Sequence, residues 1–339
     1  MIGSVAELEE RLAAPSPGVV EDLADLDGDI LVLGAGGKMG PSLVRMACNA
    51  IREAGVEKRV TAVSRFGDGR LRSQLEEAGA TTIALDLLEP GAMEALPDAA
   101  NIIYMVAMKF GSTGNEHLTW AQNAFLPGLV ARRFRDSRIV AFSTGNVYPL
   151  VPVASGGSRE GDPVGPVGEY AQSCLGRERL FEYGSHQYGT PVLLYRLNYA
   201  VELRYGTLVD IATAISNGEP IDVSMGHMNV IWQGDANRIA LRSLKLCGSP
   251  PTVLNVTGPE IVSVRRVAQE LGKLLGIEPV LVGEEQETAL LNNAGKAHTL
   301  FGYPSVTVDQ LVEWVGEWIK RGGETHGKPT KFSVRSGRF

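Results

Sequence analysis

Four glycines at close spacing lie near the start of the chain, directly after a run of β-forming residues. Residues 29–40 read DILVLGAGGKMG, and residues 30–33 within them predict a buried parallel strand. Residues 41–54 then repeat apolar side chains at the helical period. A strand, a glycine turn and a helix in this order are typical of a site that binds the pyrophosphate of a dinucleotide.

The glycines have separate roles in such a turn. Gly34 allows the chain to turn tightly, and Gly40 lets the helix pack closely on the strand. Gly36 and Gly37 let the backbone approach the pyrophosphate, whose oxygens meet free N–H groups at the start of the helix. The residues predicted to hold a cofactor here are Gly34, Gly36, Gly37, Lys38, Met39 and Gly40. The alternative is a glycine-rich turn that binds nothing.

The composition argues against several other classes of protein. The chain has 339 residues, 44% of them hydrophobic, which indicates a folded protein of one large or two intimate domains. Its net charge of −7 argues against nucleic acid or an anionic membrane as a principal partner. The cysteines and histidines show no metal-ligand spacing, so we expect no metal site. The chain begins with an acidic amphipathic segment and has no apolar run near ~20 residues, so we expect a cytoplasmic protein.

Strands and helices alternate along the first 200 residues. Strands are predicted at 30–33, 60–63, 82–85, 102–106, 139–142 and 191–197. Helices are predicted at 41–54, 71–77, 117–134 and 169–183, with Pro127 kinking or shortening the third of them. This alternation predicts an α/β fold with a doubly wound parallel sheet, the Rossmann type, over residues 29–200.

The other segments predict three further parts. Residues 201–320 predict a smaller C-terminal lobe of mixed α/β structure that covers the substrate, with helices at 208–215, 236–246, 264–275 and 308–319 and strands at 221–223, 230–232, 252–256 and 280–282. The strand at 252–256 is expected to return to the main sheet. Residues 1–28 predict a helical extension, with helices at 5–12 and 19–26, that packs on the fold or contributes to a subunit contact. Residues 321–339 predict a draped or partly disordered tail.

Three more motifs accompany the glycine turn. The features occur in this order: the GxxGxxG spacing of Gly34, Gly37 and Gly40, the segment IIYMVAMK at 102–109, the segment FSTGNVY at 142–148 with Thr144, and Tyr170, 26 residues after Thr144. In this combination the chain resembles the extended short-chain dehydrogenase/reductase family, in its NAD-dependent epimerase/dehydratase branch. The resemblance covers most of residues 29–319.

The resemblance implies roles for particular residues. Tyr170 would be the acid/base at the reacting oxygen of the substrate, and Thr144 would hydrogen-bond that oxygen. Asp86, at the end of the third strand, would accept a hydrogen bond from the adenine amino group. The other cofactor-binding residues that the resemblance implies are Leu87, Val106, Ala107, Lys109 and Asn123. Asn198 and Tyr148 are the implied substrate-binding residues.

The chain departs from the family pattern directly after the tyrosine. The family has a lysine four residues beyond it, whereas YAQSC places Cys174 there. A free tyrosine has a pKa of ~10, so only about 0.1% is ionised near pH 7, a deficit of roughly 4 kcal/mol for the base form. A nearby positive charge offsets that deficit, and a thiol cannot supply one. Cys174 is therefore either a small buried apolar residue or a nucleophile.

Arg177 and Lys109 are the candidates to replace the missing lysine. Arg177 lies seven residues after Tyr170 on nearly the same face of the helix, and its side chain leans back toward the helix start. Lys109 stands where a lysine of the epimerase branch touches the cofactor. We assign Arg177 to the electrostatic field at the tyrosine and Lys109 to the ribose or nicotinamide. The alternatives are a surface salt bridge of Arg177 with Glu178 or Glu182, and a solvated loop lysine.

The end of the second strand bears on the choice of nicotinamide cofactor. An acidic residue there would bind the adenosine ribose and select NAD. This chain has Ser64 and Arg65 instead, and arginine suits a 2′-phosphate, which favours NADP. The alternative is that Arg65 stacks on adenine while NAD is bound.

These observations favour an NAD(P)-dependent oxidoreductase or epimerase that acts on a secondary alcohol or ketone of a sugar-like substrate. Neutral Tyr170 is a competent acid, so loss of the lysine would bias the enzyme toward reduction or transient redox chemistry. The alternative is a non-catalytic dinucleotide-binding regulator on the same fold. By analogy with the family, we expect a homodimer formed through the helices at 117–134 and 169–183.

Overall fold

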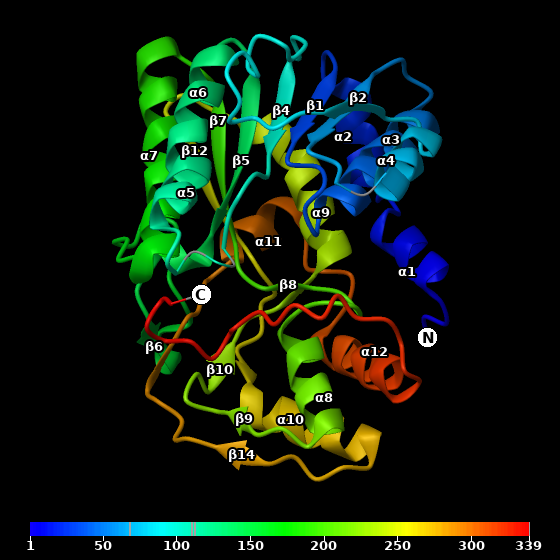
Figure 1. The fold of residues 1–339 in the computed structure, drawn as a ribbon, viewed down its shortest axis with the longest axis vertical. Coiled ribbons are helices and arrows are strands. Elements are labelled where there is room, and N and C mark those ends of the chain that lie inside the picture. Colours follow the sequence, from blue (N-terminus) through cyan, green and yellow to red (C-terminus); the bar gives the residue numbers. More distant parts are fainter. Residues whose placement is uncertain (68, 110, 112, 339) are drawn as a thin grey trace.

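The computed structural model describes residues 1–67, 69–109, 111 and 113–338, and its core is a seven-stranded parallel sheet. The strands are β1 (Ile30–Leu33), β2 (Val60–Ser64), β3 (Thr81–Ala84), β4 (Asn101–Tyr104), β5 (Arg138–Thr144), β7 (Val192–Leu197) and β12 (Thr252–Val256). Their order across the sheet is β12-β7-β5-β4-β1-β2-β3, which confirms the predicted doubly wound fold (Figure 1). The strand at 252–256 does return to the sheet, where it pairs in parallel with β7.

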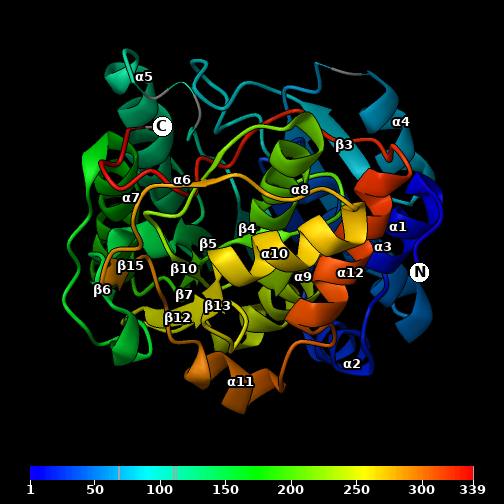
Figure 2. The same ribbon diagram turned by 90° about the horizontal axis from the view of Figure 1, so that it is seen from below.

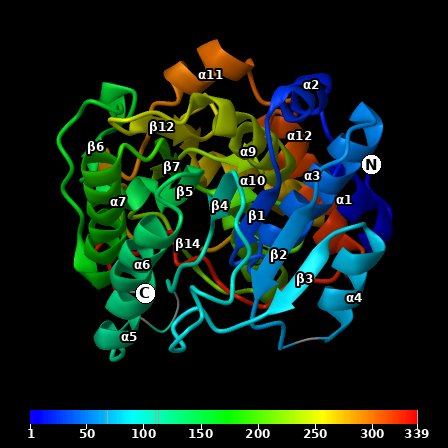
Figure 3. The ribbon, with the colours of Figure 1, turned by 90° about the horizontal axis from the view of Figure 1, so that it is seen from above.

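Successive residues of β1 point to opposite faces of the sheet and are buried on both. Ile30 and Val32 pack into one apolar cluster with α2 (Pro17–Asp25), α3 (Gly40–Ala54) and α9 (Gln233–Arg242). Leu31 and Leu33 pack into another with α6 (Leu126–Arg133) and α7 (Gly168–Tyr188). The sheet is therefore covered on both sides (Figure 3). This explains why its strands are continuous apolar runs rather than alternating ones.

The helix predicted at 117–134 is divided into three pieces. These are α5 (Glu116–Trp120), a π-helical turn at Ala121–Phe125, and α6, which begins just before Pro127. Leu126 N–H bonds to the carbonyl of Ala121, five residues back. Proline has no N–H to offer the carbonyl of Asn123, which instead accepts from Arg177 Nε at 3.4 Å. The proline thus leaves the carbonyl of Asn123 free to accept a hydrogen bond from helix α7.

The C-terminal lobe has its own apolar core and lies below the sheet in Figure 1. Its helices are α8 (Thr207–Asn217), α10 (Val264–Leu275) and α12 (Val308–Lys320), whereas α11 (Gly295–Phe301) packs against β12 and the apolar cluster on one face of the sheet. Short strand pairs complete it: β6 (Val151–Pro152), β8 (Ala200–Val201), β9 (Ile221–Asp222), β10 (His227–Met228), β11 (Ile231–Trp232), β13 (Val262–Ser263), β14 (Leu281–Val282) and β15 (Thr288–Ala289). The sequence did not predict α11 or several of these two-residue strands, which are too short for a periodic signal.

The N-terminal helices pack on different parts of the molecule. Leu8 and Leu12 of α1 (Val5–Leu12) are buried in the core of the C-terminal lobe. Helix α2 packs on α3 and α9 beside the sheet, and α4 (Gly69–Glu77) covers β3. The extension therefore contacts both the lobe and the sheet domain, which is the seven-stranded sheet with the helices that cover it. Within the described residues, no helix combines the length and apolar character needed to cross a membrane.

Candidate functional site

The glycine turn joins β1 to α3 at the carboxyl end of the sheet. Gly34 has a φ of +91°, and a Cβ there would lie 2.8 Å from the backbone nitrogen of Val106. A Cβ on Gly40 would lie 2.3 Å from the carbonyl oxygen of Ala35. Side chains are therefore excluded at both positions, which lets the turn and the start of α3 lie close to the sheet. The first turn of α3 carries no acidic residue, and its N-terminus suits an anion.

A cavity of about 220 Å³ lies beside the turn, at the ends of β2 and β3. Ser64, Arg65, Asp86 and Leu87 line it, as expected for an adenosine site. A Cβ on Gly36 would lie 2.3 Å from Ser64 Oγ, so the turn also contacts the end of β2. Arg65 Nη1 lies 3.9 Å from Asp86 Oδ2, and 72% of the Arg65 side chain is exposed. Such a pair contributes little to holding the guanidinium in place.

A second cavity, of about 270 Å³, lies between the sheet domain and the C-terminal lobe. The glycine turn lines one side of it, and Thr144 and Tyr170 line another. Thr144 is the last residue of β5 and Tyr170 lies in the first turn of α7, so the carboxyl end of the sheet brings them together. Their hydroxyls are hydrogen-bonded to each other. Thr144 Oγ1 also accepts from the backbone N–H of Asn146 at 3.2 Å, which fixes its orientation.

Tyr170 is buried and carries a neutral hydroxyl. Burial raises its pKa well above the usual value of a tyrosine, and Cys174 raises it further. The positive charge of Arg177 and the hydrogen bond from Thr144 act in the opposite direction but are smaller influences. At neutral pH the group is therefore a proton donor, which is the state required of an acid in reduction.

Cys174 is fully buried beside Tyr170. Burial raises the pKa of its thiol, while Arg177 and a hydrogen bond with Tyr170 lower it by less. The thiol is therefore protonated at neutral pH, whereas a nucleophilic cysteine needs a lowered pKa. Cys174 thus contributes volume and a weak hydrogen bond at the position of the family lysine, and no charge.

Arg177 is buried and does not make the surface salt bridge considered as its alternative. Its Nη1 donates to the carbonyl of Phe142 at 2.6 Å, and its Nη2 donates to Asn123 Oδ1 at 3.0 Å. Glu178 is instead paired with Arg196, and Glu182 is paired with Arg179. The guanidinium is held by backbone and amide oxygens and pairs with no carboxylate of the described residues, so its charge can act on Tyr170.

Asn123 connects the turn after β4 to helix α7. Its Oδ1 accepts from Met108 N at 2.8 Å, and its Nδ2 donates to Met108 O at 2.9 Å. The same Nδ2 lies 3.0 Å from Ser173 Oγ. Asn123 lies outside the described linings of the two cavities and is fully bonded within the protein. Its position indicates that it orients this turn, rather than contacting the cofactor as the sequence suggested.

Lys109 follows that turn and is not a solvated loop lysine. Its Nζ donates to the carbonyl of Thr330 at 3.1 Å and lies 5.8 Å from the centre of the Tyr170 ring. Burial lowers the pKa of Lys109 to about 8, and the neighbouring Asp210 partly opposes this shift. Lys109 is therefore a cation near neutral pH that lies beside the candidate acid. Ala107 and Lys109 both line the cavity, as expected from the segment 102–109.

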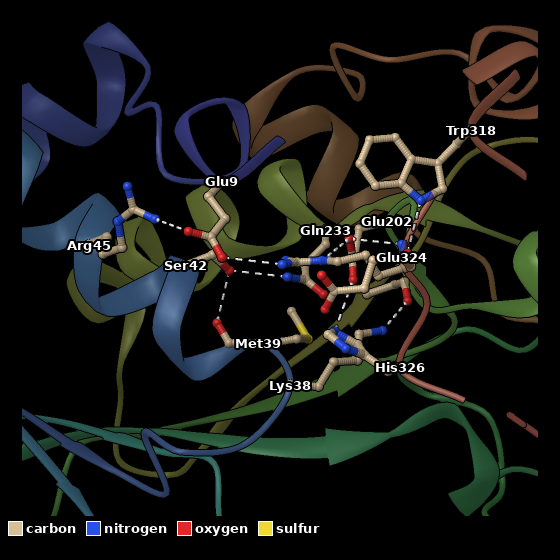
Figure 4. Close-up of polar contacts among 12 residues, drawn as sticks. Glu9, Lys38, Met39, Ser42, Arg45, Glu202, Gln233, Trp318, Glu324 and His326 are labelled. Atoms are coloured by element: carbon tan, nitrogen blue, oxygen red, sulfur yellow. Dashed lines mark hydrogen bonds and ion pairs between the residues drawn. The ribbon is translucent and has the colours of Figure 1, made fainter. Parts of the chain in front are cut away.

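Lys38, within the glycine turn, extends across to the C-terminal lobe. Its Nζ donates to the carbonyl of Ala200 at 2.7 Å and lies 3.9 Å from the centre of the Tyr205 ring. Burial lowers the pKa of Lys38 to about 7, and the nearby Glu202 raises it by less. Glu202 in turn pairs with His326 at 3.4 Å, and Figure 4 shows these groups beside Lys38. The turn thus presents a lysine to the space between the two parts of the protein.

The two residues implied to bind substrate have different surroundings. Asn198 lines the cavity with Tyr170, and its Nδ2 is 3.4 Å from the carbonyl of Leu290. Tyr148 is buried away from that cavity, and its hydroxyl is bonded to Asn255 Oδ1 at 2.9 Å and to Arg196 at 2.6 Å. Because both hydrogen bonds are satisfied inside the protein, the structure does not support the expected contact between Tyr148 and a substrate.

Several residues that line the cavity at Tyr170 were not found from the sequence. They are Tyr199, Tyr205, Thr207 and Thr330. Thr207 is fully buried, and among the described residues its hydroxyl has no hydrogen-bond partner. No local motif marks these positions, because the chain brings them to Tyr170 only through the packing of the C-terminal lobe and the tail. Within the described part of the chain, no group of three or more His, Cys, Asp or Glu side chains could hold a metal ion.

The doubly wound sheet and the glycine turn against its first strand define a dinucleotide-binding type of α/β protein. Residues 30–201 match the model of the NAD dependent epimerase/dehydratase family, and the chain belongs to this family. The resemblance noted in the sequence is thereby confirmed. No curated protein sequence matches the chain significantly.

Solved structures of similar fold include several enzymes with bound NAD. The UDP-glucuronic acid 4-epimerase from Bacillus cereus in complex with NAD has a TM-score of 0.72 at 18% identity, covering 86% of this chain and 97% of that one. The Bordetella bronchiseptica enzyme WbmG in complex with NAD has a TM-score of 0.71 at 20% identity, covering 90% and 98%. The UDP-glucose 4-epimerase from Thermotoga maritima has a TM-score of 0.70 at 16% identity, covering 87% and 99%. At these identities the likeness shows a shared fold.

Proposed function

We propose that the protein is an NAD(P)-dependent enzyme that acts on a secondary alcohol or ketone of a sugar-like substrate, with Tyr170 as the proton donor. The observation that carries this proposal is the hydrogen-bonded pair of Thr144 and Tyr170 in a cavity that the glycine turn also lines. Membership of an NAD-dependent family supports the cofactor, and the similar folds of UDP-sugar epimerases support a sugar-like substrate.

The residues present fit a dinucleotide. The cavity at Ser64 and Arg65 would hold adenosine, and the turn would hold the pyrophosphate, because Gly34 and Gly40 leave no side chain in its path. Lys38 would place a positive charge beside those phosphates. The cofactor supplies hydride transfer when bound, and the cavity at Tyr170 would hold its reactive ring beside the substrate.

The protein's own residues would then donate one proton to the substrate and hydrogen-bond the substrate oxygen that receives it. Tyr170 donates its proton to the substrate oxygen as negative charge develops there, and Thr144 hydrogen-bonds that oxygen. Arg177 would stabilise the tyrosinate that remains, because its positive charge lowers the pKa of Tyr170. Asn198 and Thr207 line the same cavity and would bind substrate hydroxyls. Proton donation from a neutral tyrosine fits the reductive direction or a transient redox step.

Replacing Tyr170 by phenylalanine tests the proposal. We expect Tyr170→Phe to lower kcat by about 100-fold or more, the usual contribution of a general acid, while the Kd for the cofactor stays the same. Tyr183→Phe is the matched control, because Tyr183 lies on the same helix and is 60% exposed. Turnover would be measured with NADH and NADPH across sugar, sugar-acid and UDP-sugar substrates. Unchanged turnover in Tyr170→Phe would contradict the proposal, and cofactor binding without turnover in the unaltered protein would favour the alternative of a regulator.

A further inference from the structure

The C-terminal tail, residues 321–338, crosses the boundary between the sheet domain and the C-terminal lobe. It leaves α12, where Trp318 Nε1 donates to the carbonyl of Glu324 at 2.9 Å, and ends against Gly168 at the start of α7, as Figure 2 shows for the red segment. Phe332 is buried in the core of the lobe, and Arg335 donates to Thr288 at 2.7 Å. The tail is thus anchored on both sides of the catalytic cavity.

Between these anchors, Thr330 is held by Asp210. Asp210 Oδ2 accepts a hydrogen bond from the backbone N–H of Thr330 at 2.7 Å and another from its hydroxyl. We call these two hydrogen bonds the clamp. Asp210 lies in the first turn of α8, so the clamp joins the tail to a helix of the lobe. Thr330 itself is 3% exposed and lines the cavity that contains Tyr170. The tail is therefore a wall of this cavity.

The carbonyl of Thr330 faces the other part of the molecule. It accepts from Lys109 Nζ at 3.1 Å, and this ammonium lies 5.8 Å from the ring centre of Tyr170. Lysine has a long flexible side chain that populates many rotamers unless a contact selects one. A continuous series of contacts therefore runs from Asp210 through Thr330 and Lys109 to Tyr170.

We propose that the tail is part of the active site and that Thr330, clamped by Asp210, is a positioning residue that keeps the Lys109 ammonium beside Tyr170. The inference rests on the proposed function, because it assigns that ammonium to the reaction of Tyr170. It identifies where this chain obtains a lysine near its tyrosine when Cys174 occupies the family position. The lysine comes from the turn after β4, and its place is set by a segment more than 200 residues away in sequence.

Two substitutions at Asp210 distinguish the effect of its hydrogen bonds to Thr330 from the effect of its negative charge. Asp210→Ala removes the acceptor of both hydrogen bonds, whereas Asp210→Asn keeps an oxygen acceptor and loses the charge. Asp309→Ala is the matched control, because Asp309 also lies in the first turn of a lobe helix but pairs with Arg266 at the surface. Each protein would be compared in full length, with its tail exposed to limited trypsin.

The first readout does not require turnover. Competitive acylation followed by mass spectrometry measures the reactivity of the Lys109 amine as a function of pH. In the unaltered protein it should titrate near pH 8, with Asp210, Cys174 and Lys331 as the charged or titratable neighbours. In Asp210→Ala the loosened tail admits water, which raises the pKa of Lys109, while loss of the Asp210 charge lowers it; because burial is the largest influence on this group, the titration should move toward the usual lysine pKa. Cleavage of the tail by trypsin should become faster in the same variant.

The second readout is the pH profile of kcat. We expect kcat to fall about tenfold in Asp210→Ala, a typical cost of a misplaced group, and its alkaline limb to follow the shifted titration of Lys109. Asp309→Ala should stay close to the unaltered protein in both readouts. Asp210→Asn keeps the hydrogen bonds to Thr330 but loses a charge that raises the pKa of Lys109, so the titration of Lys109 should move slightly lower and kcat should fall less than in Asp210→Ala. The inference is overturned if Asp210→Ala leaves Lys109 and kcat unchanged, if only trypsin cleavage changes, or if Asp210→Asn is as impaired as Asp210→Ala. If Lys109 shifts as expected but no substrate is turned over by the unaltered protein, the placement holds and the proposed function fails.

Discussion

Tyr170 has surroundings that favour a proton donor over a base. Burial raises its pKa, and the thiol of Cys174 supplies no charge to lower it. Arg177 and Lys109 lie nearby, but the first is committed to the carbonyl of Phe142 and the second to the carbonyl of Thr330. These cations lower the free energy needed to form tyrosinate, but Tyr170 remains protonated at neutral pH. These surroundings agree with the proposed donation of a proton from Tyr170 to a developing alkoxide.

Arg65 is the residue that bears on NADP against NAD. Its guanidinium is mostly exposed and makes only a long ion pair with Asp86, so it can reorient toward a 2′-phosphate. Arg65→Glu should weaken binding of NADPH by about 10- to 100-fold, the value of a charge-assisted hydrogen bond, and change NADH binding much less. Arg59→Glu is the control, because Arg59 precedes the opposite end of the same strand β2 and is 63% exposed.

Isothermal titration of NADH and NADPH would measure this ratio. An unchanged preference in Arg65→Glu would mean that Arg65 does not contact the phosphate. In that case its position beside Asp86 would agree better with stacking on adenine in an NAD site, the alternative left open by the sequence.

The turn from β1 to α3 is the element on which cofactor binding depends. Its glycines differ in what surrounds them: a Cβ on Gly40 would lie 2.3 Å from the carbonyl of Ala35, whereas one on Gly37 would lie 3.4 Å from the carbonyl of Gly34. The first is a clash with backbone, which cannot move aside, and the second is near an ordinary contact. Substitutions at these two positions should therefore have different effects: one on the stability of the fold, and the other on cofactor binding.

We expect Gly40→Ala to lower the free energy of unfolding by about 1–3 kcal/mol, the usual cost of overpacking. Gly37→Ala should leave the free energy of unfolding nearly unchanged and still weaken cofactor binding, because the new methyl group lies where backbone would approach the pyrophosphate. Urea unfolding and cofactor titration measure the two effects. If both substitutions lowered the free energy of unfolding equally, the prediction that a methyl group fits at Gly37 would be wrong.

At the scale of the whole molecule, the active cavity is formed where separate parts of the chain meet. Lys38 of the turn bonds to Ala200 of the lobe, and Thr330 of the tail bonds to Lys109 of the sheet domain. The N-terminal helix α1 adds a further contact between them, because Glu9 pairs with Arg45 of α3 (Figure 4) and also with Arg204 of the lobe. These contacts join the sheet domain and the lobe around the cavity.

The homodimer remains a prediction, and the outer surface of the helices at one side of the sheet offers a test. Phe125 and Tyr183 are each 60% exposed there, and Trp120 is 38% exposed. Phe125→Glu should convert a dimer to a monomer, because a charge would be buried at the apolar interface. Leu300→Glu, at an exposed position on α11, is the control. Light scattering after size-exclusion chromatography measures the mass, and an unaltered protein that runs as a monomer would contradict the expectation.

The sequence by itself determined the sheet and its cofactor turn. Strands such as 30–33 are short apolar runs, and the helices between them repeat apolar residues at a clear period, so the local pattern was enough. The order GAGGKMG predicted the turn, and the spacing of Thr144 and Tyr170 predicted that these two residues lie together. These features depend on residues that are neighbours along the chain or that follow the regular rhythm of the fold.

Only the tertiary structure decided what surrounds that acid. It showed that Arg177 is buried against backbone oxygens, that Tyr148 is bonded away from the cavity, and that the proline in the long helix produces a π-helical turn. It also showed that Asp210 and Thr330 reach the site from the lobe and the tail. Tyr148 and Asn255 are 107 positions apart, and Asp210 and Thr330 are 120 apart, so these contacts depend on how separately folded elements pack. No local pattern of side chains encodes that packing, which is why they could be found only once the chain was folded.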